Sequence, residues 1–284
     1  MPDAVIVTDS VACLPAQLVQ QYAIEIIPFN LMANGKYYHD GVDITAEQAY
    51  AILLQDPDSF KTSPYTPDEC LEVFRKVGKR AARIICVTVS AKISTAFNVA
   101  SLIRERAKLE IPGVKIDLLD SETAASGEGF VVLAAARAIE AGKSAAEALE
   151  AARQVKQKVH SLVLLESMQH VYRSGRVPRI AAQAASVLNI RPIFTLYGAV
   201  HFETAVRNSK TGIERMLYLM NEKVDKKPIH CAVMHAFDLR RAEDLKQQVA
   251  RDFNCIELWI SEFSPIMGYA TGTGTLGLAF YTES

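Results

Sequence analysis

The chain has 284 residues, half of them apolar, so it is long enough for two domains with substantial cores. Its net charge of −1 and pI of about 6.6 argue against a nucleic acid or an anionic membrane surface held by bulk charge. The N-terminus lacks the basic and apolar segments of a signal peptide, and no apolar run approaches the ~20 residues that cross a bilayer. We expect no transmembrane segment.

The first half of the sequence alternates short apolar runs with helical patterns. Strands are predicted at about 4–7, 24–29, 84–89 and 115–119, and helices at about 15–22, 46–54, 67–78, 96–109, in an Ala-rich segment ending near 142, and at 144–159. Such alternation is typical of a doubly wound, mostly parallel sheet. We therefore predict an N-terminal α/β domain over residues 1–157.

Local signals fix several of these elements. Capping boxes begin at Thr45, Thr66 and Ser144, each followed three residues later by Glu or Gln. Asn34-Gly35 lies between apolar flanks and predicts a β-hairpin, whereas the segment 61–66 is expected to be a turn.

The second half of the sequence has a different rhythm. Strands are predicted at about 161–165, 193–196, 200–206, 229–234, 256–260 and 275–281, and helices at 168–174, 178–188, 210–221 and 239–252. Hairpin-like strand pairs beside helices favour an α+β domain over residues 158–284. The predicted architecture is thus a parallel-sheet domain packed against an α+β domain.

The segment 84–97 combines a buried strand with a hydroxyl-rich turn before a helix. Such a turn presents hydroxyls and free N–H groups that suit a carboxylate or a phosphate, but for one such turn alone the favoured interpretation is that Ser94 is a simple helix cap. Hydroxyls also follow other predicted strands, at Thr8, Ser10, Thr88, Ser90 and Ser121. We expect them to share one polar edge of the sheet.

Several common functional motifs are absent from the sequence or lie in the wrong structural context. Gly272, Gly274 and Gly277 match a dinucleotide-binding pattern, but a strand follows them instead of a helix, so NAD binding is rejected. The histidine spacing supports no metal site, and neither a nucleophile elbow nor a P-loop is present. Asp9 and Asp120 lie at strand ends, where capping of the next helix is favoured over a catalytic role. The five cysteines are odd in number and widely spaced, which favours a reducing, cytoplasmic compartment.

Several weak motifs occur in the same order as in one known family, and together they span nearly the whole chain. They are the segments 8–15 (TDSVACLP), 62–67 (TSPYTP), 90–96 (SAKISTA), 120–129 (DSETAASGEG), 174–176 (SGR), 188–193 (LNIRPI) and 270–277 (ATGTGTLG). On these segments the sequence resembles the DegV family of fatty-acid-binding proteins.

The resemblance implies a carrier that buries one long-chain fatty acid, such as palmitate, with the ligand at the junction of the two domains, and that needs no cofactor, metal or catalytic group. It implies that Thr62 and Ser94 bind the carboxylate, with their neighbours Ser63 and Thr95 also in the site. Arg176 and Arg207 are implied to lie near the carboxylate. Some members of the family present the fatty acid to an ATP-binding kinase subunit, which makes an acyl phosphate.

The sequence departs from the family pattern at three places. Thr95-Ala96 replaces Gly-Thr, Pro64-Tyr65 replaces Gln-Pro, and Ala270 stands where the family has histidine. A second hypothesis is therefore kept open, an enzyme that acts on a small carboxylated or phosphorylated metabolite at the same edge, with Asp9 or Asp120 as base.

Overall fold

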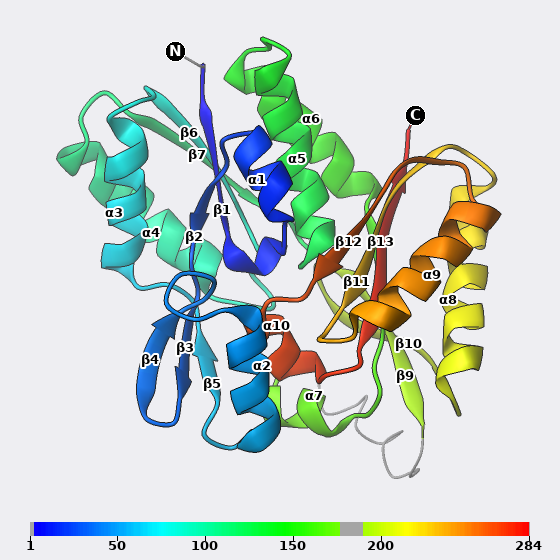
Figure 1. Ribbon diagram of the computed structural model, residues 1–284. Helices are drawn as coiled ribbons and strands as arrows, with labels where there is room; N and C mark the ends of the chain where they lie inside the picture. Colours follow the sequence, from blue (N-terminus) through cyan, green and yellow to red (C-terminus); the bar gives the residue numbers. More distant parts are fainter. Residues whose placement is uncertain (1–2, 177–189, 284) are drawn as a thin grey trace.

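The computed structural model describes residues 3–176 and 190–283, which form two large sheets side by side (Figure 1). The first sheet has the order β2-β1-β6-β7, and all its pairs are parallel: β1 (Val5–Asp9), β2 (Glu25–Ile27), β6 (Arg83–Thr88) and β7 (Lys115–Asp120). Buried β-branched side chains fill these strands, as expected of a sheet covered on both faces.

Helices cover both faces of the first sheet. One face carries α3 (Pro67–Gly78) and α4 (Ala96–Glu110), and the other carries α1 (Ala16–Gln21) and α5 (Ser126–Glu140), with α6 (Ala145–Lys158) packed on α5 (Figure 1). The predicted doubly wound arrangement is confirmed.

A small sheet and one helix extend from the first sheet. The small sheet has the order β4-β3-β5 and consists of β3 (Asn30–Ala33), β4 (Lys36–His39) and β5 (Lys61–Ser63). The helix α2 (Ala46–Gln55) lies between β4 and β5 in the sequence. Asn34 and Gly35 have positive φ angles of 52° and 73°, which confirms the predicted hairpin. The predicted turn at 61–66 is wrong in its first half, because Thr62 pairs with Leu31 as part of β5.

The three predicted capping boxes are present. In α2, α3 and α6 the side chain of the cap residue (Thr45, Thr66 or Ser144) accepts from the backbone three residues on, and the Gln or Glu there returns the bond. These starts were predictable because the bonds are local.

The second sheet has the order β10-β9-β8-β13-β11-β12, and only the pair β11–β12 is parallel among these described strands. Its members are β8 (His160–Leu164), β9 (Arg191–Tyr197), β10 (Ala199–Val206), β11 (Ile229–His235), β12 (Cys255–Glu262) and β13 (Leu276–Thr282). The helices of this half are α7 (Gln169–Ser174), α8 (Ser209–Val224), α9 (Leu239–Asp252) and α10 (Pro265–Thr271). The α+β prediction is confirmed, while the predicted helix at 178–188 lies outside the described residues.

The two sheets share one apolar core across their junction, which contains Val87 of β6 and Phe194 of β9. The Tyr50 hydroxyl of α2 donates to the carbonyl of Phe263 at 2.8 Å, across the same junction. We propose the predicted division at residues 157 and 158, since α6 ends at Lys158 and β8 begins the second sheet.

Candidate functional site

A cavity lies between the carboxyl ends of the first sheet and the facing strands of the second. The space between atoms there amounts to about 760 Å³, part of which is open solvent. Fourteen of its 18 lining residues are apolar: Val11, Phe29, Val89, Ile93, Ala124, Val163, Leu165, Val171, Phe194, Leu196, Val200, Ile266, Met267 and Ala270. The cavity therefore suits an apolar ligand.

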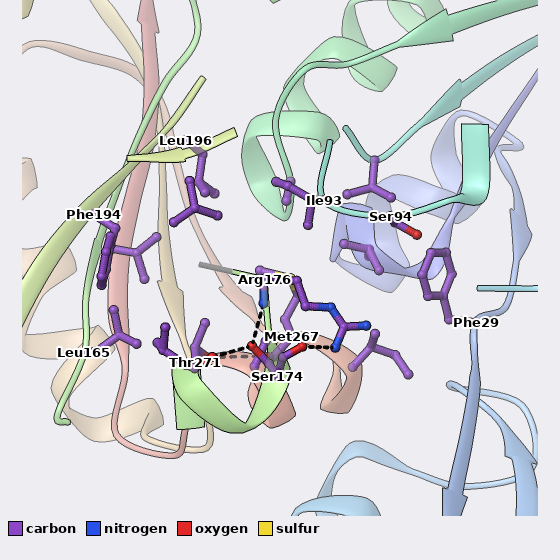
Figure 2. A pocket seen from close by; sticks show the side chains of 18 residues that line it. Phe29, Ile93, Ser94, Leu165, Ser174, Arg176, Phe194, Leu196, Met267 and Thr271 are labelled. Atoms are coloured by element: carbon purple, nitrogen blue, oxygen red, sulfur yellow. Dashed lines mark hydrogen bonds between the residues drawn. The ribbon is translucent and has the colours of Figure 1, made fainter. Parts of the chain in front are cut away.

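The two walls of the cavity come from different halves of the chain. The segments after β1, β6 and β7 supply Val11, Val89 and Ala124, in the place where open α/β sheets bind ligands. Figure 2 shows Phe29 and Ser94 on one side of the cavity and Phe194 and Leu196 on the other.

Four polar side chains line the cavity: Ser94, Ser174, Arg176 and Thr271. Ser94 is half-buried in the turn after β6, where its hydroxyl accepts from the backbone N–H of Ala96 at 3.3 Å. Thr95 is the residue that precedes α4, and it makes no side-chain cap bond. A lone pair of the Ser94 hydroxyl accepts the bond from Ala96, so its O–H remains available as a donor to a ligand in the cavity.

Arg176 brings a cation to the cavity. Gly175 ends α7 with a φ of 67°, a left-handed conformation that glycine adopts readily. The Arg176 guanidinium then donates to the carbonyl of Ser174 at 2.9 Å and to the hydroxyl of Thr62 at 3.5 Å. Among the described residues it has no carboxylate partner, so its charge remains available to an anionic ligand.

The residues nominated from the sequence separate into two groups. Ser94 and Arg176 line the cavity, and Thr62 joins them through its bond to Arg176. The structure does not bring Ser63, Thr95 or Arg207 to the cavity wall, and all three are exposed.

The expectation of a shared polar edge built from strand-end hydroxyls is wrong. The hydroxyls of Thr8, Ser90 and Ser121 are buried and bond to Glu128, the carbonyl of Gly198 and the carbonyl of Thr123, respectively. None of them lines the cavity. Buried hydroxyls need hydrogen-bond partners inside the protein, and these three use their bonds to hold the loops in place.

The two strand-end carboxylates also hold loops. Asp9 accepts from the backbone N–H groups of Val11 and Val89, each at 3.0 Å, and Asp120 accepts from Ala91 and Glu122. Burial raises the pKa of Asp9 from 3.8 to about 7, despite its two backbone bonds. Neither carboxylate lines the cavity. The prediction of a helix cap is confirmed for Asp9, which caps the short 3-10 helix Ser10–Ala12, and is wrong for Asp120, because α5 begins after Ala125 without a side-chain cap.

Sequence reasoning missed Ser174, Thr271 and the whole of α10. Ser264 before Pro265 and Gly272 after Thr271 are the start and stop signals of a short helix. The Thr271 hydroxyl donates to the carbonyl of Met267 at 3.0 Å.

Other kinds of site are not indicated in the described part of the chain. In residues 3–176 and 190–283, no group of three or more His, Cys, Asp or Glu side chains is placed to hold a metal ion. No helix in these ranges is long and apolar enough to pass through a membrane.

A family model described as "Uncharacterised protein, DegV family" matches residues 3–283. The chain belongs to the DegV family. A DegV domain-containing protein of Clostridium perfringens is 29% identical over 282 residues, which are 98% of this chain and 99% of that protein.

Solved DegV structures share the fold described above. A DegV family protein of Thermus thermophilus, described as binding a fatty acid, aligns over 100% of both chains with a TM-score of 0.90 and 24% identity. DegV of Bacillus subtilis, described as a fatty acid binding protein, also aligns over 100% of both chains with a TM-score of 0.90, at 23% identity.

Proposed function

We propose that this DegV protein binds one long-chain fatty acid in the cavity between its two sheets. The observation that carries the proposal is the Arg176 guanidinium, which has no carboxylate partner in residues 3–176 and 190–283 and lies at the wall of a cavity that is otherwise almost entirely apolar. A carboxylate on a hydrocarbon chain matches both parts of this surface. The fatty acids bound by the two similar DegV structures support the same ligand class.

In this proposal the carboxylate lies among Ser94, Thr62 and Arg176. The two hydroxyls donate neutral hydrogen bonds and the guanidinium donates a charged one, which is the stronger kind. The tail extends along Phe194, Leu165 and the other apolar lining residues. Burying a tail of about 16 carbons at ~0.8 kcal/mol per CH₂ supplies ~12 kcal/mol before the costs of binding. The tail therefore dominates affinity, and the polar groups orient the ligand.

We further propose that the protein is a cytoplasmic carrier that presents the carboxylate to an ATP-binding kinase subunit. The exposed Arg207 supports this step, because a cation on the surface near β9 and β10 suits an acyl phosphate or the phosphates of ATP. The enzyme hypothesis receives no such support from Asp9 or Asp120, whose oxygens are occupied by backbone N–H groups.

Extraction of the purified protein with organic solvent, followed by mass spectrometry, tests the proposal. We expect about one fatty acid per chain. A protein that is purified empty and binds neither added palmitate nor added oleate would contradict it. Acyl phosphate formation with a fatty-acid kinase subunit and ATP tests the carrier step separately.

A further inference from the structure

The turn between β9 and β10 is hydrogen-bonded to the first sheet beside the cavity. Gly198 forms this turn with a φ of 68°. Its N–H donates to the carbonyl of Glu122 at 2.5 Å, and its carbonyl accepts from the hydroxyl of Ser90. Ser90 and Gly198 are 108 residues apart and belong to different sheets, so the bonds exist only while the turn is docked.

Ser90 also orders the loop that carries Ser94. The Ser90 carbonyl accepts from the N–H groups of Ile93 at 2.9 Å and Ser94 at 3.0 Å. Its hydroxyl accepts in addition from the N–H of Lys92 at 3.3 Å. One fully buried side chain thus links the Ser94 turn to the opposite domain.

The walls of the cavity flank this contact. Ile93 and Ser94 line the cavity on the side of Ser90, and Leu196 and Val200 line it on the two strands that meet at Gly198. Figure 2 shows Leu196 facing Ile93 across the cavity. If the turn at Gly198 moved away from the first sheet, Leu196 and Val200 would move away from Ile93 and Ser94. The cavity between these two walls would then open to solvent.

We infer that the contact of Ser90 with Gly198 is a clasp whose release lets the ligand enter and leave the cavity. The inference rests on the proposed function, because the ligand is the fatty acid proposed above. Ser90 does not line the cavity, so it is a positioning residue and not a ligand-binding one. Loss of its hydroxyl leaves the Gly198 carbonyl unpaired only in the closed state, which shifts the equilibrium toward the open state.

The test compares ligand release from the wild type, Ser90→Ala and Ser121→Ala. Ser121 is a matched control, since it is a buried serine after the neighbouring strand whose hydroxyl bonds within its own loop, to Thr123 at 3.2 Å. Release of bound palmitate into excess albumin is followed by stopped flow. We expect release about fivefold to tenfold faster from Ser90→Ala, and unchanged release from Ser121→Ala. Equal release from the wild type and Ser90→Ala would overturn the clasp.

Amide hydrogen exchange at Gly198 separates this inference from the proposed function. We expect protection in the wild type, more protection with palmitate and less in Ser90→Ala. If the wild type binds no fatty acid, the proposed function fails. Independently of that result, an unprotected Gly198 amide in the wild type would overturn the clasp. Should Ser90→Ala not fold, Gly198→Ala replaces it. Its Cβ meets only Lys92 Nζ at 3.6 Å, but its positive φ disfavours alanine, so the same changes are expected.

Discussion

The guanidinium of Arg176 lies 3.5 Å from the hydroxyl of Thr62, although the two residues are 114 positions apart in the chain. The contact joins β5, in the small sheet of the first half, to the turn after α7 in the second half. The contact joins a cation to a neutral hydroxyl, so it does not neutralise the charge of Arg176. It therefore holds a cation and a hydroxyl in position for an anion that arrives with the ligand.

Arg176→Ala should weaken binding of palmitate about tenfold to hundredfold, because a hydrogen bond from a charged group is lost. Binding of hexadecanol, which has the same tail and no charge, should change little. Competition against a fluorescent fatty acid measures both affinities. Arg173→Ala is the control, since Arg173 faces Asp58 at 3.3 Å and does not line the cavity. Equal losses for acid and alcohol would show that Arg176 only supports the wall.

Ser94→Ala should lower the affinity for palmitate about tenfold and leave folding nearly intact, because its bond to Ala96 is a local turn contact of 3.3 Å. Thr95→Ala should leave the affinity unchanged, since Thr95 is exposed and does not line the cavity. Isothermal titration of the two variants decides which of the adjacent hydroxyls serves the ligand. A loss of affinity in Thr95→Ala with none in Ser94→Ala would show that Thr95, and not Ser94, binds the carboxylate.

Local signals explain why so much of the fold was predictable. The capping boxes at Thr45, Thr66 and Ser144 and the Asn34-Gly35 turn depend on residues close in sequence, and each is present. The strand β5 was missed, because Lys61–Ser63 becomes a strand only by pairing with β3. A three-residue polar segment carries no periodic signal for such pairing.

The site was predictable only in part, for a similar reason. The sequence places Ser94 after a buried strand, but it does not show that the hydroxyls of Ser90 and Ser121 turn inward to carbonyl groups. It also does not show that α10 and α7 complete the cavity, since this depends on their packing against each other from distant parts of the chain. Which polar groups stay free is decided by tertiary contacts.

Ala270→His should strengthen binding of palmitate about fivefold to tenfold. Ala270 lines the cavity on α10, and the resemblance to the family pattern implies a histidine there. An imidazole N–H adds a donor for the carboxylate. Ala270→Leu adds apolar bulk without a donor and should not favour the acid over hexadecanol. A histidine variant that binds acid and alcohol with unchanged relative affinity would contradict the prediction.

Acid should destabilise the junction through Glu257. Burial opposes ionisation of this carboxylate, but hydrogen bonds from His230 and Arg137 outweigh it and lower its pKa from 4.5 to about 2. Because the folded pKa is depressed, the contribution to stability is complete above pH ~4.5 and is lost as the pH falls toward ~2. Urea unfolding between pH 2 and 6 should show this loss, and Glu257→Gln should reduce it. Glu72→Gln, at an exposed position on α3, should not.

Affinity should rise with chain length until the apolar part of the cavity is full. Each CH₂ buried contributes ~0.8 kcal/mol, or about fourfold in affinity, and the gain should stop where the tail reaches the end of the cavity. Dissociation constants for saturated acids of about 10 to 18 carbons locate this point. Affinities that do not depend on chain length would place the tail outside the cavity.

Phe194→Leu tests which wall limits the tail. Phe194 lines the cavity and is backed by Phe202, with ring centroids 5.9 Å apart, so a smaller side chain should lengthen the space available. The chain length at which affinity stops rising should therefore increase. Phe280→Leu removes a similar volume from a second apolar core, which lies between the second sheet and helices α8 and α9 and does not line the cavity. This variant should cost stability without moving this point. If Phe194→Leu leaves this chain length unchanged, the tail runs along another part of the cavity and Phe194 serves only to pack the second sheet.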